Sequence, residues 1–372
     1  MRRLSVALLA SLVVAGCLGG AAPPDDAAGN ASVVDGSRPE PTFNDLTTEQ
    51  LGSAAAPDAD ASLATAPALR EGEWWRIEMH DLFLDETTEF VRVVARVEPD
   101  LYVFGMPHAG WWKEAIIYHA PAFGDVGLDL SHRAHDLPFE PLRFPLEDGA
   151  TWETAWETPD PVTATVAVES GTTARVTFTG TQCGAFALVG QCPTPQQGTI
   201  AEVVYDASIH EISEASFPSH TWRVVEHGYG YTGWVTVPRA EHLVFLHGRV
   251  GTPAIDVVNP GPALPTDTVE VEGGFNRVSF ILVAGNAVGS AGGAYSEKAT
   301  APDGTVFELR QVPGGALAVA FFEHPDPDGT WQLEHLAAGP GFVFTEGIAY
   351  HQYDIELPTG RIRSDHSHEV VR

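Results

Sequence analysis

The sequence predicts an all-β protein in which two β-sandwich or curved-sheet domains follow a disordered tether. Short runs of β-branched and aromatic residues recur between Asp, Pro and Gly, as is typical of strands joined by turns. No stretch combines sustained helical periodicity with helix caps. A proline-rich break at 255–267, built around Asn259-Pro-Gly-Pro-Ala-Leu-Pro265, divides the strands into two groups and predicts an inter-domain linker.

Residues 1–16 have the pattern of a signal peptide. Arg2 and Arg3 give a positive start, and the apolar run that follows is well short of the roughly 20 residues that span a bilayer. Val14-Ala15-Gly16-Cys17 resembles the lipobox of exported lipoproteins, which is cut before a cysteine that then carries the lipid. The resemblance implies lipidation of Cys17 and attachment to the outer face of the cell membrane. An ordinary secretory peptide is the alternative.

The composition is strongly acidic. The chain has 50 Asp plus Glu against 20 Lys plus Arg, a net charge of -30, and its only lysines are Lys113 and Lys298. Nucleic acid is excluded as a partner because its phosphates would be repelled, and direct electrostatic binding to an anionic membrane is disfavoured for the same reason. An acidic composition with so few lysines resembles that of surface lipoproteins of salt-loving archaea; the alternative is a merely acidic protein from a GC-rich genome.

Residues 17–67 are rich in Ala, Pro, Asp, Gly and Ser, and Phe43 is their single aromatic residue. Such a segment buries too little apolar surface to offset its ordering entropy, so we expect a disordered tether. Asn30-Ala-Ser32 is a glycosylation sequon, which makes Asn30 a candidate modification site.

The larger all-β domain is expected over 68–254. Its predicted strands cover 73–80, 89–97, 101–104, 163–168, 174–178, 200–205 and 221–225. Residues 207–216 fit one helical face through Ile209 and Ile212 nearly as well as they fit strand alternation.

Cys183 and Cys192 remain once Cys17 is assigned to the anchor. In an exported chain such a pair predicts a disulfide, worth on the order of 2 to 3 kcal/mol for a loop of this length. A two-cysteine zinc knuckle is disfavoured because the spacing is long and no histidine lies nearby.

A smaller β-sandwich domain is expected over 268–358, followed by a polar tail over 359–372. Pro302-Asp-Gly-Thr-Val-Phe-Glu-Leu309 and Pro327-Asp-Gly-Thr-Trp-Gln-Leu333 are similar to one another, and each predicts a tight turn followed by a strand. These two segments resemble the small jelly-roll or β-sandwich modules appended to secreted proteins. The resemblance implies a fold and brings no catalytic residue with it.

The 15 histidines include candidate metal ligands. His132, His135 and Asp136 form a candidate set if their loop folds back on itself, and Asp365-His-Ser-His-Glu369 is a second. His324-Pro-Asp-Pro-Asp-Gly329 resembles the start of a calcium loop, in which Asp326 and Asp328 are the candidate ligands. Solvated surface side chains are the alternative for each, so the expected cofactor is none, with calcium or a transition metal as the rival.

Aromatic residues suggest a binding platform. Tyr229, Tyr231 and Trp234 lie close together between glycines, and rigid aromatic faces suit stacking on sugars or capture of a peptide. Trp74 and Trp75 point to opposite faces of a sheet, so one is available for contact unless both faces are covered. Core packing is the alternative for all of them.

Catalytic motifs are incomplete, so no catalytic residue is assigned. His210-Glu-Ile-Ser-Glu214 lacks the second histidine of a zinc-protease helix, and Val288-Gly-Ser-Ala-Gly292 lacks the first glycine of a nucleophile elbow. The sequence therefore predicts a lipid-anchored cell-surface protein with a binding or structural role toward a carbohydrate, a peptide or a surface protein. The alternative is a secreted hydrolase or metal-dependent enzyme whose site is assembled from dispersed residues such as His80, His119, Asp206 and Glu211.

Overall fold

The computed structural model of the chain describes residues 46, 48–55, 58, 61–82, 86–107, 124–130, 140–154, 162–182, 196–217, 220–247, 267–271, 274–286, 294–312, 317–325, 328–338, 341–364 and 369–370. Almost all of them lie in strands or turns, which confirms the predicted all-β class. The helical parts of these ranges are one turn of α-helix, α1 (Thr48–Leu51), and one 3-10 turn, η5 (Ala207–Ile209). No helix among them is long and apolar enough to cross a membrane.

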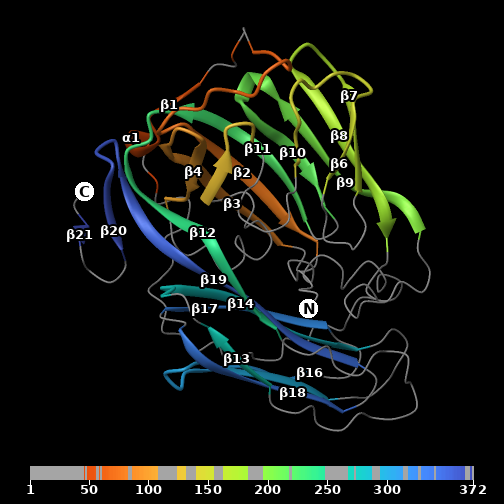
Figure 1. Cartoon of the computed structure of the whole chain (residues 1–372), viewed down its shortest axis with the longest axis vertical. Coiled ribbons are helices and arrows are strands. Elements are labelled where there is room, and N and C mark those ends of the chain that lie inside the picture. The colour runs from red at the N-terminus through yellow and green to blue at the C-terminus, as the bar shows by residue number, and fades with distance from the viewer. Residues whose placement is uncertain are drawn as a thin grey trace.

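The largest element is one antiparallel sheet with the strand order β5-β4-β3-β2-β11-β10-β9-β8-β7-β6, to which β1 is added beside β11 (Figure 1). Its strands are β1 (Ser53–Ala54), β2 (Trp74–Asp81), β3 (Glu86–Val97), β4 (Leu101–Gly105), β5 (Gly124–Gly127), β6 (Thr151–Thr154), β7 (Val162–Val168), β8 (Thr173–Gln182), β9 (Gln196–Asp206), β10 (Glu211–Ser216) and β11 (His220–Tyr229). The sheet curves strongly around its inner face but does not close, because β5 and β6 remain its two edges among the described strands.

The core of this sheet lies on its inner face. Along β7 buried and exposed residues alternate, as expected for a strand with one covered face. Side chains from nearly every strand meet in one apolar cluster, whose aromatic members include Trp75, Phe90, Tyr102, Phe104, Trp152, Phe178, Tyr205 and Trp222. A sheet that curls around a single core in this way is the curved sheet that the sequence predicts.

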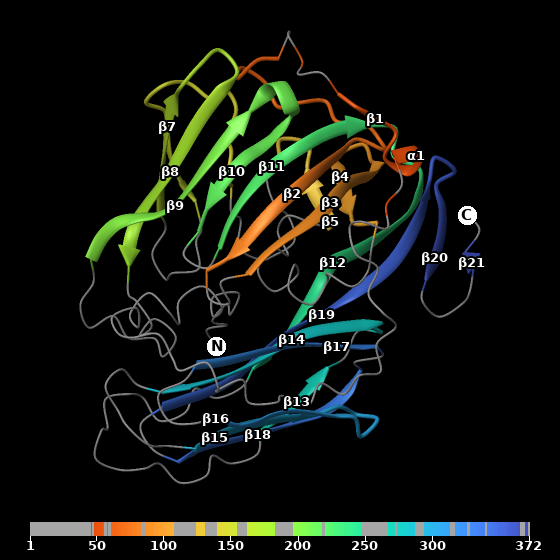
Figure 2. The same cartoon turned by 180° about the vertical axis from the view of Figure 1, so that it is seen from behind.

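The second half of the chain forms two further sheets that face each other as a sandwich (Figure 2). One has the order β17-β14-β19-β20-β21, with β12 added beside β19, and the other has the order β13-β18-β15-β16. The strands are β12 (Gly233–His247), β13 (Asp267–Val271), β14 (Arg277–Asn286), β15 (Ala294–Thr300), β16 (Val306–Val312), β17 (Leu317–Pro325), β18 (Gly329–Ala338), β19 (Gly341–Leu357), β20 (Arg361–Ser364) and β21 (Glu369–Val370).

The long strands β12 and β19 also cover the outer face of the curved sheet. A second apolar cluster joins Trp74, Val91 and Val93 of the curved sheet to Val235 and Ile355 of the sandwich. The start of β2 and residues 90–95 of β3 are therefore buried on both faces. As a result, Trp74 and Trp75, which point in opposite directions, are only 1% and 0% exposed, and neither is available as a surface contact.

Three boundaries differ from the sequence prediction. The range 17–67, expected as a tether, contains ordered parts, because β1 pairs with β11, Leu51 of α1 packs on the outer apolar cluster and Leu63 is buried in the inner core. Strand β12 falls in the range expected for the larger domain, yet it pairs with β19 of the sandwich. The expected polar tail contributes β20, which pairs with β19. Leu51 in the expected tether and Ile362 in the expected tail both pack on the outer apolar cluster. Each is an isolated apolar residue in its segment, so neither forms a local pattern that would have predicted this packing.

Candidate metal centre

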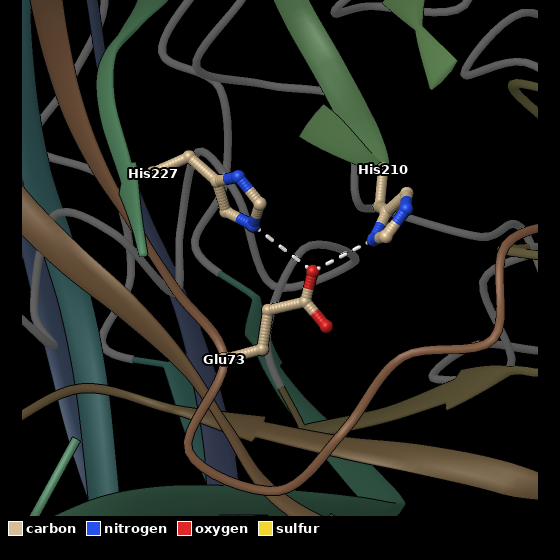
Figure 3. A group of neighbouring side chains, drawn as sticks. All are labelled: Glu73, His210 and His227. Atoms are coloured by element: carbon tan, nitrogen blue, oxygen red, sulfur yellow. Dashed lines mark hydrogen bonds and ion pairs between the residues drawn. The ribbon is translucent and has the colours of Figure 1, made fainter. Parts of the chain in front are cut away.

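Three side chains from distant parts of the chain converge where β2 and β10 begin and β11 ends (Figure 3). The carboxylate of Glu73 lies between two imidazoles, with Oε1 2.9 Å from Nδ1 of His210 and 3.0 Å from Nε2 of His227. One ligand atom from each residue lies within 4.8 Å of the other two. Two imidazole nitrogens and one carboxylate oxygen in such an arrangement form a potential metal-binding set.

The strand order brings these residues together. Glu73 immediately precedes β2, His227 lies near the end of the neighbouring strand β11, and His210 immediately precedes β10, the next strand along. Because β2 and β10 flank β11, residues separated by 137 and 154 positions in sequence become neighbours.

Glu73 is held by a tight turn. Gly72 adopts a φ of 79°, which a glycine accepts without strain, and the Glu73 N–H donates to the carbonyl of Arg70 at 3.0 Å. The N–H of Arg70 in turn donates to Oε2 of Glu73 at 3.1 Å. One carboxylate oxygen therefore binds the backbone, which leaves Oε1 directed at the two histidines.

His210 ends the 3-10 turn η5. Asp206 caps that turn by accepting the N–H of Ser208 at 2.9 Å, and His210 follows in the left-handed region with a φ of 60°. Histidine is among the residues that tolerate this conformation better than most, although it is uncommon outside glycine. A non-glycine residue in this region often marks a functional site, because its backbone is held by the surrounding structure.

His227 is fixed by Trp75, the residue paired with it across β2 and β11. The two rings are stacked, with centroids 5.5 Å apart and planes 13° apart. Burial is nearly complete, because the Glu73 side chain is 0% exposed and that of His227 is 3% exposed, whereas that of His210 is 15% exposed. The cluster is thus buried with His210 at its outer side.

A second charged pair lies next to the cluster. Arg92 of β3 forms a buried ion pair with Glu211, the residue after His210, and its guanidinium lies over the ring of Phe104. Burial raises the pKa of Glu211 although the Arg92 guanidinium opposes this effect. Glu73 contributes a further rise in the pKa of Glu211, which shows that the two carboxyl groups are electrostatically coupled.

Glu73 and His210 stabilise one another's charged forms. Burial works against ionisation of Glu73, but hydrogen bonds from His210 and His227 outweigh it, so its pKa lies below the ordinary value. The hydrogen bond to Glu73 raises the pKa of His210 against the opposing effect of burial, and Asp58 adds to the rise.

The geometry and the charge both fit a divalent transition-metal ion. A tetrahedral ion with bonds of about 2.0 to 2.2 Å holds its ligand atoms about 3.3 to 3.6 Å apart, so Oε1 of Glu73 and each histidine nitrogen need to separate by about 0.3 to 0.7 Å. The carboxylates of Asp58, Glu73 and Glu211 lie around the two histidines, and the guanidinium of Arg92 is paired with Glu211. Carboxylates gathered in this way favour a bound cation.

The sequence-predicted metal and modification sites consist of other residues. His132, His135 and Asp136 fall outside the described residues, as do Cys17, Asn30, Cys183 and Cys192, so the predictions about them stay predictions. The same holds for His119, for residues 288–292, for Asp326 and for residues 365–368 of the tail. Asp328 is described, and its carboxylate accepts the backbone N–H groups of Gly274 and Phe275. It therefore holds a loop.

The predicted aromatic platform is partly core. Tyr231 is buried in the outer apolar cluster and donates through its hydroxyl to the carbonyl of Trp234 at 3.1 Å. Trp234 is half-buried beneath the guanidinium groups of Arg361 and Arg363, which lie 5.0 and 4.1 Å from its ring centroid. Tyr229 is half-buried and meets the ring of His227 edge-on, with centroids 5.0 Å apart. The three aromatic side chains do not share one exposed face.

The dispersed residues named for the alternative enzyme are only partly brought together. Asp206 and Glu211 flank the turn that carries His210, whereas His80 contacts Thr87 near the far end of β2. Sequence reasoning missed Glu73 and His227, and it considered His210 only as the start of an incomplete protease motif. A useful signal was Glu73 itself, an acidic residue placed directly before two tryptophans at the start of a buried strand.

Comparison with known proteins gives no further identification. No known protein family matches the chain, and no curated protein matches it. A solved structure of isomalto-dextranase from Arthrobacter globiformis T6, complexed with panose, is 12% identical over 54% of this chain and 35% of its own, with a TM-score of 0.17. This chain thus spans about a third of that enzyme. The VP2 subviral particle of infectious bursal disease virus is 11% identical over 82% of this chain and 77% of its own, with a TM-score of 0.15. At such TM-scores neither likeness carries an argument.

Proposed function

We propose that this chain is an exported, lipid-anchored cell-surface protein whose folded part binds a divalent transition-metal ion at Glu73, His210 and His227. The observation that carries the proposal is the convergence of three ligand atoms within 4.8 Å in the buried end of the curved sheet. The anchor and the surface location come from the lipobox-like Val14-Ala15-Gly16-Cys17. The role is binding, as the incomplete catalytic motifs also suggest.

The donor set selects the class of ion. Two imidazoles with one carboxylate suit Zn²⁺ and its first-row neighbours, whereas Ca²⁺ and Mg²⁺ prefer a shell made of oxygen ligands. We therefore expect zinc or a related ion at this centre.

Metal-dependent hydrolysis is the second candidate. Three protein ligands is the number found in catalytic zinc sites, where a water molecule occupies the fourth position. Burial argues against hydrolysis, because Glu73 is fully buried and His227 nearly so, whereas a substrate must be able to reach the ion. A buried centre therefore favours metal binding over catalysis. Ester or peptide hydrolysis that is lost in Glu73→Gln would favour the enzyme instead.

Metal analysis of the purified mature chain tests the proposal. We expect close to one transition-metal ion per chain after dialysis, and loss of that ion in Glu73→Gln, His210→Ala and His227→Ala. His324→Ala is the matched control, because His324 is also buried and also faces a carboxylate, that of Asp303 at 3.2 Å, but has no second histidine ligand beside it among the described residues. A metal-free wild-type chain that also takes up no added Zn²⁺ would refute metal binding.

The anchor has its own test. Cys17→Ser should move the protein from the membrane fraction to the medium, while its metal content stays that of the wild type. Mass spectrometry of the wild-type chain should find a lipid on Cys17. An unprocessed Met1 start would contradict the anchor and leave the metal centre standing.

A further inference from the structure

The described part of residues 46–58, which we call the strap, ends at the metal centre. In β1, Ser53 pairs with Tyr229 and Ala54 pairs with Gly228 of β11. The N–H of Ala55 then donates to the carbonyl of His227 at 2.9 Å, and the N–H of Asp58 donates to the carbonyl of Ser208 at 2.9 Å. The strap is therefore bonded to both chain segments that carry the histidines.

The side chain of Asp58 completes this connection. Its Oδ2 lies 3.5 Å from Nε2 of His210, which is the ring nitrogen on the side opposite to the Glu73 hydrogen bond. A histidine that binds a metal through one nitrogen usually donates its other N–H to a carboxylate or a carbonyl, which fixes the tautomer and the ring orientation. Asp58 occupies that position for His210.

We propose that Asp58 is a positioning residue of the metal centre, and that docking of the strap and binding of the ion strengthen one another. This inference rests on the proposed metal function. Asp58 favours the His210 tautomer that presents Nδ1 to the ion, so a docked strap raises the affinity for the metal. Linkage then requires that the bound ion stabilise the docked strap by the same factor.

The strap is suited to such coupling because none of its residues whose burial is described is fully buried. Its contacts include two β-pairs, the two backbone bonds described above, a bond from the Thr232 N–H to the carbonyl of Gln50 at 2.8 Å, and two partly buried leucines, Leu46 and Leu51. A segment without buried side chains opens at a lower free energy than the whole fold. Its docked population can therefore respond to a ligand.

Zinc affinity gives the first test, with the mature chain carrying Cys17→Ser used as the soluble parent. We expect Asp58→Ala to weaken Zn²⁺ binding about 10-fold or more, as is usual when the outer partner of a metal-bound histidine is lost. Glu49→Ala is the matched control, because Glu49 is an exposed acidic residue of the same strap and should leave the affinity unchanged. Ala55→Pro removes the N–H that bonds His227 and should also weaken binding, without changing Asp58.

Amide hydrogen exchange gives the second test. Zn²⁺ should slow exchange at Ala54, Ala55 and Asp58 in the parent, and this slowing should be much smaller in Asp58→Ala. The melting temperatures of the two metal-free proteins should agree, which separates positioning from a general loss of structure.

The possible failures are distinguishable. If the parent binds Zn²⁺ and Glu73→Gln does not, but Asp58→Ala keeps the parent's affinity and Zn²⁺ leaves strap exchange unchanged, the coupling is refuted and the metal centre stands. If the parent binds no Zn²⁺, the metal function itself fails and the coupling fails with it.

Discussion

The indole of Trp75 holds both histidine-bearing segments at once, since its ring is stacked on His227 while its N–H donates to the carbonyl of Ile209 at 2.7 Å. Ile209 is the residue before His210. One buried side chain thus sets the distance between the two imidazoles, and the position of the metal centre depends on a core residue as much as on its ligands.

Replacing Trp75 by Phe should therefore cost more than the same change at Trp74. Both tryptophans are fully buried, so the two substitutions remove the same side-chain volume. Only Trp75→Phe also removes a hydrogen bond, because the indole N–H of Trp74 has no hydrogen-bond partner among the described residues. We expect Trp75→Phe to be less stable than Trp74→Phe by about 1 to 3 kcal/mol, the cost of leaving a buried carbonyl without its donor. Urea unfolding measures the difference, and equal losses in the two variants would contradict it.

The buried pair Arg92 and Glu211 should behave differently from a surface pair. Arg92→Met leaves the carboxylate of Glu211 buried without its partner, and we expect a loss of about 3 to 5 kcal/mol. Arg223→Met breaks an ion pair with Glu78 whose arginine side chain is 61% exposed, and it should cost less than about 1 kcal/mol. The double variant Arg92→Met, Glu211→Gln should recover part of the loss. If the double variant loses as much stability as Arg92→Met and Glu211→Gln lose in total when each is made alone, the two residues do not interact.

Gly228 should not accept a side chain. A Cβ added there would collide with the ring of Trp74 and lie 2.6 Å from the carbonyl oxygen of Ser53, so Gly228→Ala must displace either the core or the strap. We expect a loss of about 1 to 3 kcal/mol. Gly171→Ala is the control, since a Cβ there meets nothing within 4 Å, and its melting temperature should equal that of the wild type. A Gly228→Ala variant as stable as this control would show that the strap is not packed as described.

The curved sheet and the sandwich should unfold together. They share the outer apolar cluster, and a β-bridge joins Met106 to Thr236 through hydrogen bonds of 2.9 and 2.7 Å. Calorimetry should therefore give a single transition whose van't Hoff and calorimetric enthalpies agree. Two separate transitions would restore the independent domains that the proline-rich linker suggests.

Local sequence patterns predict most strands of the curved sheet and fewer strands of the sandwich. Alternation over 163–168 identifies β7, and the β-branched run at 89–97 identifies most of β3. The ambiguous segment 207–216 divides into a 3-10 turn and the strand β10, because Asp206 caps only one turn and His210 reverses the backbone. The alternation of β7 and the β-branched run of β3 depend on neighbouring residues, so a single sequence reveals them, whereas it leaves the division of 207–216 undecided.

The candidate site depends on which strands become neighbours. His227 is one of several polar residues in the strand 220–229, and nothing in the local sequence distinguishes it from the others. The pairing of β11 with β2 places it against Trp75 and Glu73. The strap is similar, since Asp58 lies in a stretch whose composition predicts disorder and whose order comes from contacts with β11 and η5. Neither pairing leaves a local pattern in the chain.

The strap also lies on the path that mechanical load would take into the fold. If the proposed lipid on Cys17 anchors the chain, a pull on it reaches residues 46–58 before it reaches Leu63 in the inner core. On that path the two pairs between β1 and β11 come before the bond from Asp58 to Ser208. Tension would then act on the segments that carry His227 and His210 before it acts on the rest of the curved sheet.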